Sequence, residues 1–253
     1  GLTASDALLS GTDNIAIGRL AFSASTDGAD NIAIGRSALA VSGNDGDTNI
    51  AIGLSALGTG DVAGAGNIGI GASALAAVTS GTNNIGVGLT ASDALLSGTD
   101  NIAIGRLAFS ASTDGADNIA IGRSALAVSG NDGDTNIAIG LAALGTGDVA
   151  GAGNIGIGAS ALTALTGGTN NIGIGLTSSD ALLTGTDNIA IGRLSFSAST
   201  DGADNIAIGR SALAVSGNDG DTNIAIGLAA LGTGDVAGAG NIGIGASALT
   251  ALT

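Results

Sequence analysis

The side chains of this sequence that could take part in chemistry are those of Asp, Asn, Ser, Thr and Arg. Its 253 residues include 21 acidic and six basic side chains, all Asp and Arg, and no His, Cys, Lys, Glu, Tyr, Trp or Met. A serine nucleophile needs a neighbouring base such as His or Lys to take its proton. Zinc, haem and iron–sulfur centres need His or Cys ligands. We therefore expect neither an enzyme nor a bound cofactor.

Aspartates in two recurring loops offer oxygen ligands of the kind that calcium prefers. The candidates lie in segments 27–30 and 44–47, at Asp27, Asp30, Asp45 and Asp47. Neither segment matches the twelve-residue calcium loop, which ends in Glu, or the nonapeptide repeat of calcium-binding β-rolls. Asp, Asn and Gly are also the residues that ordinary turns require. We favour turns and keep calcium as the weaker alternative.

The charge balance limits the partners. A net charge of −15 provides no basic stripe to neutralise phosphates, so we expect neither nucleic acid nor an anionic membrane surface as a partner. No stretch resembles an apolar membrane span of about 20 residues, and no signal peptide is visible. The chain begins in mid-repeat without Met, and we interpret it as a piece of a longer array.

A five-residue motif, Asn-Ile-(Ala/Gly)-(Ile/Val)-Gly, recurs fourteen times at spacings of 17 or 18 residues. Five successive spacings form an 87-residue block, and the blocks begin at Gly1, Gly88 and Gly175. Such a period indicates one supersecondary unit per repeat, with neighbouring units burying a shared core. We expect residues 1–253 to form a single continuous stack.

Each repeat is too short for a pair of helices but suits one coil of a β-solenoid. Ile32 and Ile34 flank Ala33, which is the period-two alternation of a strand. Gly35 permits a corner, and a second short segment with Leu39 near its centre follows. The predicted fold class is therefore all-β, a single-stranded parallel β-solenoid with one coil per 17–18 residues.

Stacked coils would lie about 4.8 Å apart, and fourteen of them would give a rod about 65–70 Å long. We expect the Ile side chains to face the interior, together with Phe22, Phe109 and Phe196. A helical interpretation competes in Ala- and Leu-rich stretches such as 73–78. Glycine at every sixth or seventh position argues against it, because each costs about 1 kcal/mol in a helix interior.

The motif Asn-Ile-Ala-Ile-Gly, followed by two variable residues and Ala-Leu, resembles the head repeats of trimeric autotransporter adhesins and related repeats of phage tail fibres. The order Ile-Gly-Arg-Ser-Ala-Leu at 34–39 also resembles the hexapeptide pattern of left-handed β-helices. These resemblances imply a left-handed parallel β-roll, a trimer of identical chains, and a surface that binds host matrix or cells.

Small residues occupy the centre of every predicted strand, on the face opposite the two Ile. In the first block these are Ala16, Ala33, Ala51, Gly69 and Gly86. If Ile faces inward, the small residues form a flat outer row that another rod could approach closely. We therefore expect association with identical chains, as a trimer or a filament. The alternative is that small residues only relieve crowding beside the corner.

Two further columns follow from the stacking. Asparagine precedes each strand, and stacked amides can hydrogen-bond along the axis, so we expect a structural ladder beginning with Asn14, Asn31, Asn49, Asn67 and Asn84. Arginine occurs only in the first two coils of each block, and Arg19 and Arg36 could form ion pairs with Asp13 and Asp30 across coils or between chains. A solvated charged face is the alternative.

The sequence thus favours an extracellular or cell-surface structural or adhesive fibre segment. The alternative is a surface-binding solenoid for ice, carbohydrate or a host receptor, with or without calcium. An ice-binding face would need regular Thr columns, whereas Thr is scattered here. A carbohydrate-binding rod would be expected to use aromatic platforms, and the chain has only three Phe.

Overall fold

The computed structural model describes residues 1–6, 10–25, 27–41, 46–128, 133–214, 220–233 and 238–250. The chain divides into two compact units, Gly1–Asp132 and Gly133–Thr253. The first unit contains β1 (Ile15–Ile17), β2 (Ile32–Ile34), β3 (Ile50–Ile52), β4 (Ile68–Ile70), β5 (Ile85–Val87), β6 (Ile102–Ile104) and β7 (Ile119–Ile121). The second contains β8 (Ile137–Ile139), β9 (Ile155–Ile157), β10 (Ile172–Ile174), β11 (Ile189–Ile191), β12 (Ile206–Ile208), β13 (Ile224–Ile226) and β14 (Ile242–Ile244).

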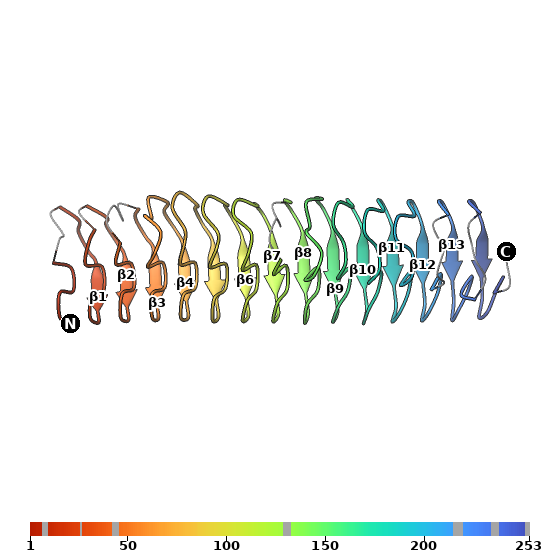
Figure 1. Ribbon diagram of the computed structural model, residues 1–253, viewed down its shortest axis with the longest axis horizontal. Coiled ribbons are helices and arrows are strands. Elements are labelled where there is room, and N and C mark those ends of the chain that lie inside the picture. The colour runs from red at the N-terminus through yellow and green to blue at the C-terminus, as the bar shows by residue number, and fades with distance from the viewer. Residues whose placement is uncertain are drawn as a thin grey trace. The chain divides into compact units, whose positions relative to one another are not determined.

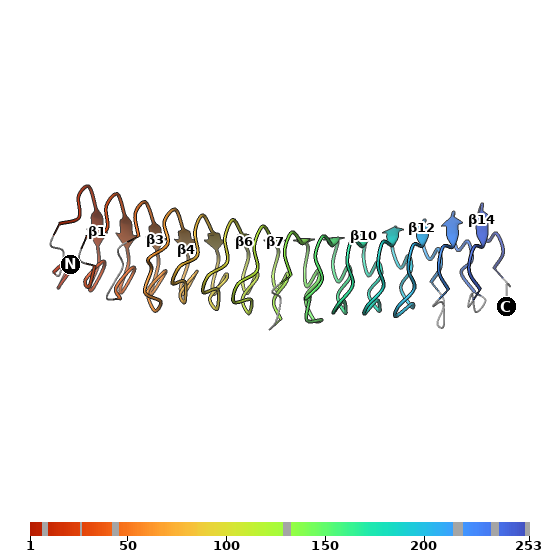
Figure 2. The same cartoon turned by 90° about the horizontal axis from the view of Figure 1, so that it is seen from above.

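Within each unit the strands lie side by side in chain order and pair in parallel (Figure 1). The register is strict: Ile15 pairs with Ile32, and Ile32 with Ile50, so each coil takes 17 or 18 residues. Each strand forms one side of its coil, and the loops return on the other side (Figure 2). The prediction of an all-β parallel solenoid is confirmed, and no helix occurs among the described residues.

The segment that follows each strand has a backbone in which the sign of φ alternates. In the coil of β2, φ is +136° at Gly35, +57° at Ser37 and +48° at Leu39. A left-handed conformation costs an L-residue about 1–2 kcal/mol. Hydrogen bonds to both neighbouring coils offset this cost: the Ser37 N–H donates to the Arg19 carbonyl at 3.0 Å, and the Leu39 N–H donates to the Ala56 carbonyl at 3.1 Å.

Glycine is required at the corner after each strand. A Cβ on Gly35 would lie 2.3 Å from the carbonyl oxygen of Gly53, the equivalent residue of the next coil. No L-side chain fits at that separation, and the positive φ adds further strain. The corner glycines therefore allow successive backbones to stack in direct contact.

The core is made of small strand residues packed against larger residues of the returning segment. Ala33 and Ala51 have no exposed surface, and Leu39 is 1% exposed. Three phenylalanines are buried in the interior of their own unit, as predicted: Phe22 and Phe109 in the first unit and Phe196 in the second.

The predicted orientation of the strands is wrong, because the small residues face inward and Ile faces outward. Ala33, Ala51, Gly69 and Gly86 are buried, and Ala16 in the first coil is half-buried. The physical reason is the narrow interior. A Cβ on Gly86 would already lie 2.9 Å from Cγ of Leu75, so there is no room for an isoleucine at the inner position.

Candidate interaction surface

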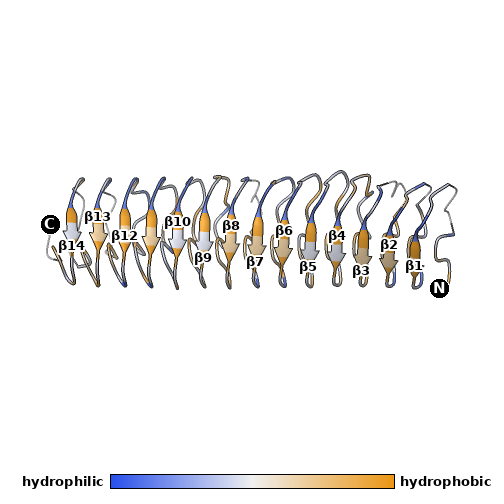
Figure 3. Cartoon of the chain, turned by 180° about the vertical axis from the view of Figure 1, so that it is seen from behind, coloured by the Kyte–Doolittle hydropathy of each residue, from blue (hydrophilic) through white to orange (hydrophobic). Residues whose placement is uncertain are grey.

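The outer face of each unit's sheet is an apolar strip, which we call the Ile face. Each strand turns two branched aliphatic side chains outward, Ile in every case except Val87 of β5. Because the strands are in register, these side chains form two columns along the stack. Most of them are partly exposed, and Ile104 and Ile191 are among the more exposed, with 40% and 37% of their surface accessible. Figure 3 shows the strands as hydrophobic bands that begin beside hydrophilic residues.

Two further columns border the Ile face. We call the residues before each ladder Asn the Asp edge, and those after each corner Gly the Arg edge. In the first unit the Asp edge consists of Asp13, Asp30, Thr48, Gly66, Asn83, Asp100 and Asp117. The Arg edge consists of Arg19, Arg36, Leu54, Ala72, Leu89, Arg106 and Arg123. The charged members of both edges are exposed.

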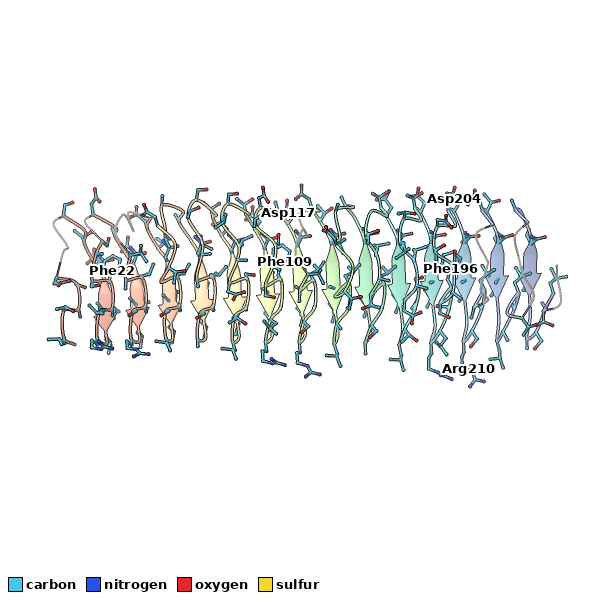
Figure 4. All side chains as sticks on the ribbon, viewed as in Figure 1. Phe22, Phe109, Asp117, Phe196, Asp204 and Arg210 are labelled. Carbon is cyan, nitrogen blue, oxygen red and sulfur yellow. The ribbon has the colours of Figure 1, made fainter. Side chains whose placement is uncertain are left out.

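The two edges lie on opposite sides of the Ile face. Figure 4 shows Asp117 and Asp204 at one side of the strands and Arg210 at the other. Five residues, 31–35, separate Asp30 from Arg36, and at about 3.3 Å per residue they hold the two side chains roughly 15 Å or more apart. In-register stacking then places the Asp residues of successive coils beside one another, and likewise the Arg residues.

The fold therefore disfavours the predicted ion pairs within the chain, between Arg19 or Arg36 and Asp13 or Asp30. The register is the cause, because a strand length always separates the two charges. Pairing between chains, which was the other part of the hypothesis, stays a prediction.

Asparagine residues form a hydrogen-bonded ladder inside each coil stack. In the first unit the column comprises Asn14, Asn31, Asn49, Asn67, Asn84, Asn101 and Asn118. The backbone N–H of Asn67 donates to Oδ1 of Asn49, and Nδ2 of Asn67 donates to the carbonyl of Gly81 in the next coil at 2.8 Å. Oδ1 of Asn67 in turn accepts from the N–H of Asn84. The amide of Asn67 thus ties its coil to both neighbours, which is a structural role. The ladder is not complete everywhere, because the buried Nδ2 atoms of Asn31 and Asn223 have no hydrogen-bond partner among the described residues.

The acidic loops give no support for a metal site. Among the described residues, no three carboxylates lie close enough together to hold a metal ion. Asp47 instead joins two neighbouring coils, because its Oδ1 accepts a hydrogen bond at 2.8 Å from the N–H of Ala29. Asp27 and Asp30 are exposed, and Asp45 lies outside the described residues.

Two aspartates differ from the rest in their environment. Burial raises the pKa of Asp93 above its ordinary value of 3.8, and burial likewise raises the pKa of Asp180. These residues are equivalent, one block apart, in the coils of β5 and β10. No pocket is present in the part of the chain that the structure describes.

Sequence reasoning missed the two features that matter most on this surface. It assigned Ile to the core and overlooked the exposed leucines of the Arg edge, such as Leu54 and Leu89, which retain 43% and 51% of their surface. The sequence did contain a signal for the exposure of these leucines. The position after each corner Gly is Arg, Leu or Ala, and Arg is mostly a surface residue, so Leu at the equivalent position of another coil should be exposed as well.

Comparisons with known proteins add no family. No family model, no curated protein and no solved structure matches this chain. Within the described residues, no helix has the length and apolar character needed to cross a membrane.

Proposed function

We propose that this chain is a segment of an extracellular structural or adhesive fibre, which associates with identical chains through its Ile face and has neither catalytic activity nor a cofactor. The outward Ile columns are the observation that carries the proposal. In the first unit alone, seven adjacent strands present fourteen branched aliphatic side chains on one face. Contiguous apolar patches of this kind mark protein–protein interfaces.

The regularity of the Ile face favours a partner that has the same period. Two aliphatic side chains recur at every coil, and the coils follow one another at the strand spacing of about 4.8 Å. A second copy of the chain has the same spacing and can therefore match the pattern over its whole length. A globular partner would match it over only a few coils.

The resemblance to adhesin head repeats supports the finer parts of the proposal. It favours three chains per fibre, a left-handed coil and exposure at the cell surface. The role as a fibre also fits the composition, because Asp, Arg, Ser and Thr alone provide no complete catalytic set. Handedness and stoichiometry are proposed on the resemblance.

Mutation of the Ile face tests association. Ile102, Ile104, Ile119 and Ile121 would be changed together to Thr, which keeps the β-branch and the strand preference but removes apolar surface. The matched control changes Leu96 and Leu183 to Thr; both are exposed and lie outside the strands. We expect the native chain and the control to sediment as oligomers, and the Ile variant to dissociate while its circular dichroism is unchanged.

Two results would overturn the proposal. One is a native chain that stays monomeric at high protein concentration. The other is an Ile variant that associates as strongly as the control, since the contact would then lie elsewhere on the coil.

A further inference from the structure

We propose that the two charged edges of the Ile face determine how the chains pair: neighbouring copies lie parallel and in register, with the Arg edge of one against the Asp edge of the next. This inference rests on the proposed association through the Ile face and specifies its geometry.

The charged residues of the two edges are separated by the Ile face. In the first unit, exposed Asp residues occur on one side of the Ile face and exposed Arg residues on the other, with a strand between them. Each chain thus carries one acidic and one basic border along the same apolar strip, so that a partner of its own kind can neutralise both.

Symmetry determines which edges of neighbouring copies meet. Consider identical subunits that are related by rotation about an axis parallel to the stacking direction. One edge of each subunit's face then meets the opposite edge of the next subunit's face. This holds for two subunits face to face and for three around a ring. Every parallel assembly of this kind therefore brings an Arg edge against an Asp edge.

An antiparallel assembly has the opposite electrostatics. A two-fold axis along the strand direction inverts the stack but leaves the strand direction unchanged. The Arg edge would then face a second Arg edge, and the Asp edge a second Asp edge. Like charges that face each other across an interface repel, which disfavours the antiparallel assembly. The two edges therefore select the parallel arrangement.

The axial positions of the charges give the register. Arg and Asp occur in the same coils of the first unit, those of β1, β2, β6 and β7. With no axial offset, all four Arg coils meet all four Asp coils. The small residues of the two edges also meet, because Gly66 and Ala72 both belong to the coil of β4. A slip of one coil leaves Arg36 facing Thr48, and half of the Arg residues lose their partners.

Each of these ion pairs is exposed, and exposed pairs contribute little to affinity. Their effect is on orientation and register, while the Ile face provides the affinity.

Disulfide trapping tests this geometry, since the chain has no native cysteine. Chains carrying Asp30→Cys and chains carrying Arg36→Cys would be mixed and oxidised. The control replaces Arg36→Cys with Leu89→Cys, on the same edge but three coils away. Antiparallel pairing inverts the stack, so a mixture of chains carrying Arg36→Cys and chains carrying Arg106→Cys, in the coils of β2 and β6, reports antiparallel pairing of the first unit centred on β4. Sedimentation of the mixtures before oxidation records association independently.

We expect the D30C and R36C mixture to give at least ten times more cross-linked dimer than the D30C and L89C mixture or the R36C and R106C mixture. Equal trapping by L89C would overturn the register, and preferential R36C–R106C dimers would overturn the parallel orientation; in both cases the proposed association itself would stand. Absence of association before oxidation would overturn the proposed function together with this inference.

Discussion

The amide of Asn67 and its own backbone N–H both donate to one oxygen, Oδ1 of Asn49 in the preceding coil, at 3.2 Å and 2.8 Å. The same amide donates forward to the carbonyl of Gly81. Buried amides are costly unless they have partners, and at Asn67 the partners are supplied by the two neighbouring coils. The short Asn side chain provides both the acceptor and the donor that this arrangement uses.

Removal of one ladder amide should therefore destabilise the stack. Asn101→Ala would leave the N–H of Asn118 and the carbonyl of Gly115 without their partner. We expect a loss of about 1–3 kcal/mol in the free energy of unfolding, measured by denaturant titration. The control is Asn83→Gly, at an exposed position with a left-handed φ of 57°, which Gly tolerates. An equal loss in the control would count against the ladder as the cause.

The inverted strand orientation gives a second prediction. Ala120 of β7 is fully buried, so Ala120→Val should overpack the interior and lower stability by about 1–3 kcal/mol. Ile119→Val, one residue away on the outer face, removes a half-exposed methylene group and should cost less than about 1 kcal/mol. Thermal melts of the two variants decide the matter. A larger loss of stability in Ile119→Val than in Ala120→Val would instead support strands with Ile facing inward, as predicted from the sequence.

The corner glycines give a third prediction, which concerns the stacking of the coils. A Cβ on Gly158 would lie 2.4 Å from the carbonyl oxygen of Gly175, at a φ of 133°. Gly158→Ala should therefore break the stacking of two coils and cost several kcal/mol, at least about 3 kcal/mol given the clash and the strained backbone.

Gly167 is the matched control, because a Cβ there would meet only a methyl group of Thr184, at 4.0 Å. Gly167→Ala should be neutral or stabilise the chain by up to about 1 kcal/mol. Urea titration of the two alanine variants provides the comparison. Similar stability in both would mean that the corner can relax.

The raised pKa of Asp93 predicts a dependence of stability on pH. Because burial raises the pKa of this carboxyl in the folded state, the folded chain holds its proton more tightly than the unfolded chain does. Stability should then fall as the pH rises from about 3.8 through the raised pKa, and stay lower above it.

Asp93→Asn should accordingly raise the melting temperature at pH 7 and have little effect at pH 3. Asp61→Asn removes the same charge from an exposed position of the same unit and serves as the control. A melting temperature at pH 7 that changes equally in both variants would attribute the effect to net charge alone.

The fold could be predicted from the sequence because its period is visible. Spacings of 17 or 18 residues with Ile at alternate positions lead directly to the strands, and Asn before each strand leads to the column that contains Asn67. The inward and outward faces could not be predicted in the same way. Alternation divides a strand into two faces, but it does not say which face is buried.

The usual preference for burying the larger apolar residue gave the wrong answer for Ile34 and Ala33. The deciding quantity is the distance between the strand and the returning segment, which depends on Leu39 and its equivalents and on their left-handed backbone. That backbone is unusual for leucine, and no residue pattern signals it. Because of this error, the interface expected from the sequence was the row of Ala33 and its equivalents, whereas the outward residues are the Ile columns.

Within each unit, the hydrogen bonds of the ladder join residues only 14 to 18 positions apart in the sequence. Such local contacts allow an all-β chain to fold by adding one coil at a time to an existing stack, with no long loop to close. The same property governs its mechanics. Tension applied at one end of a unit should peel off coils singly, and each would release about 60 Å of extended chain.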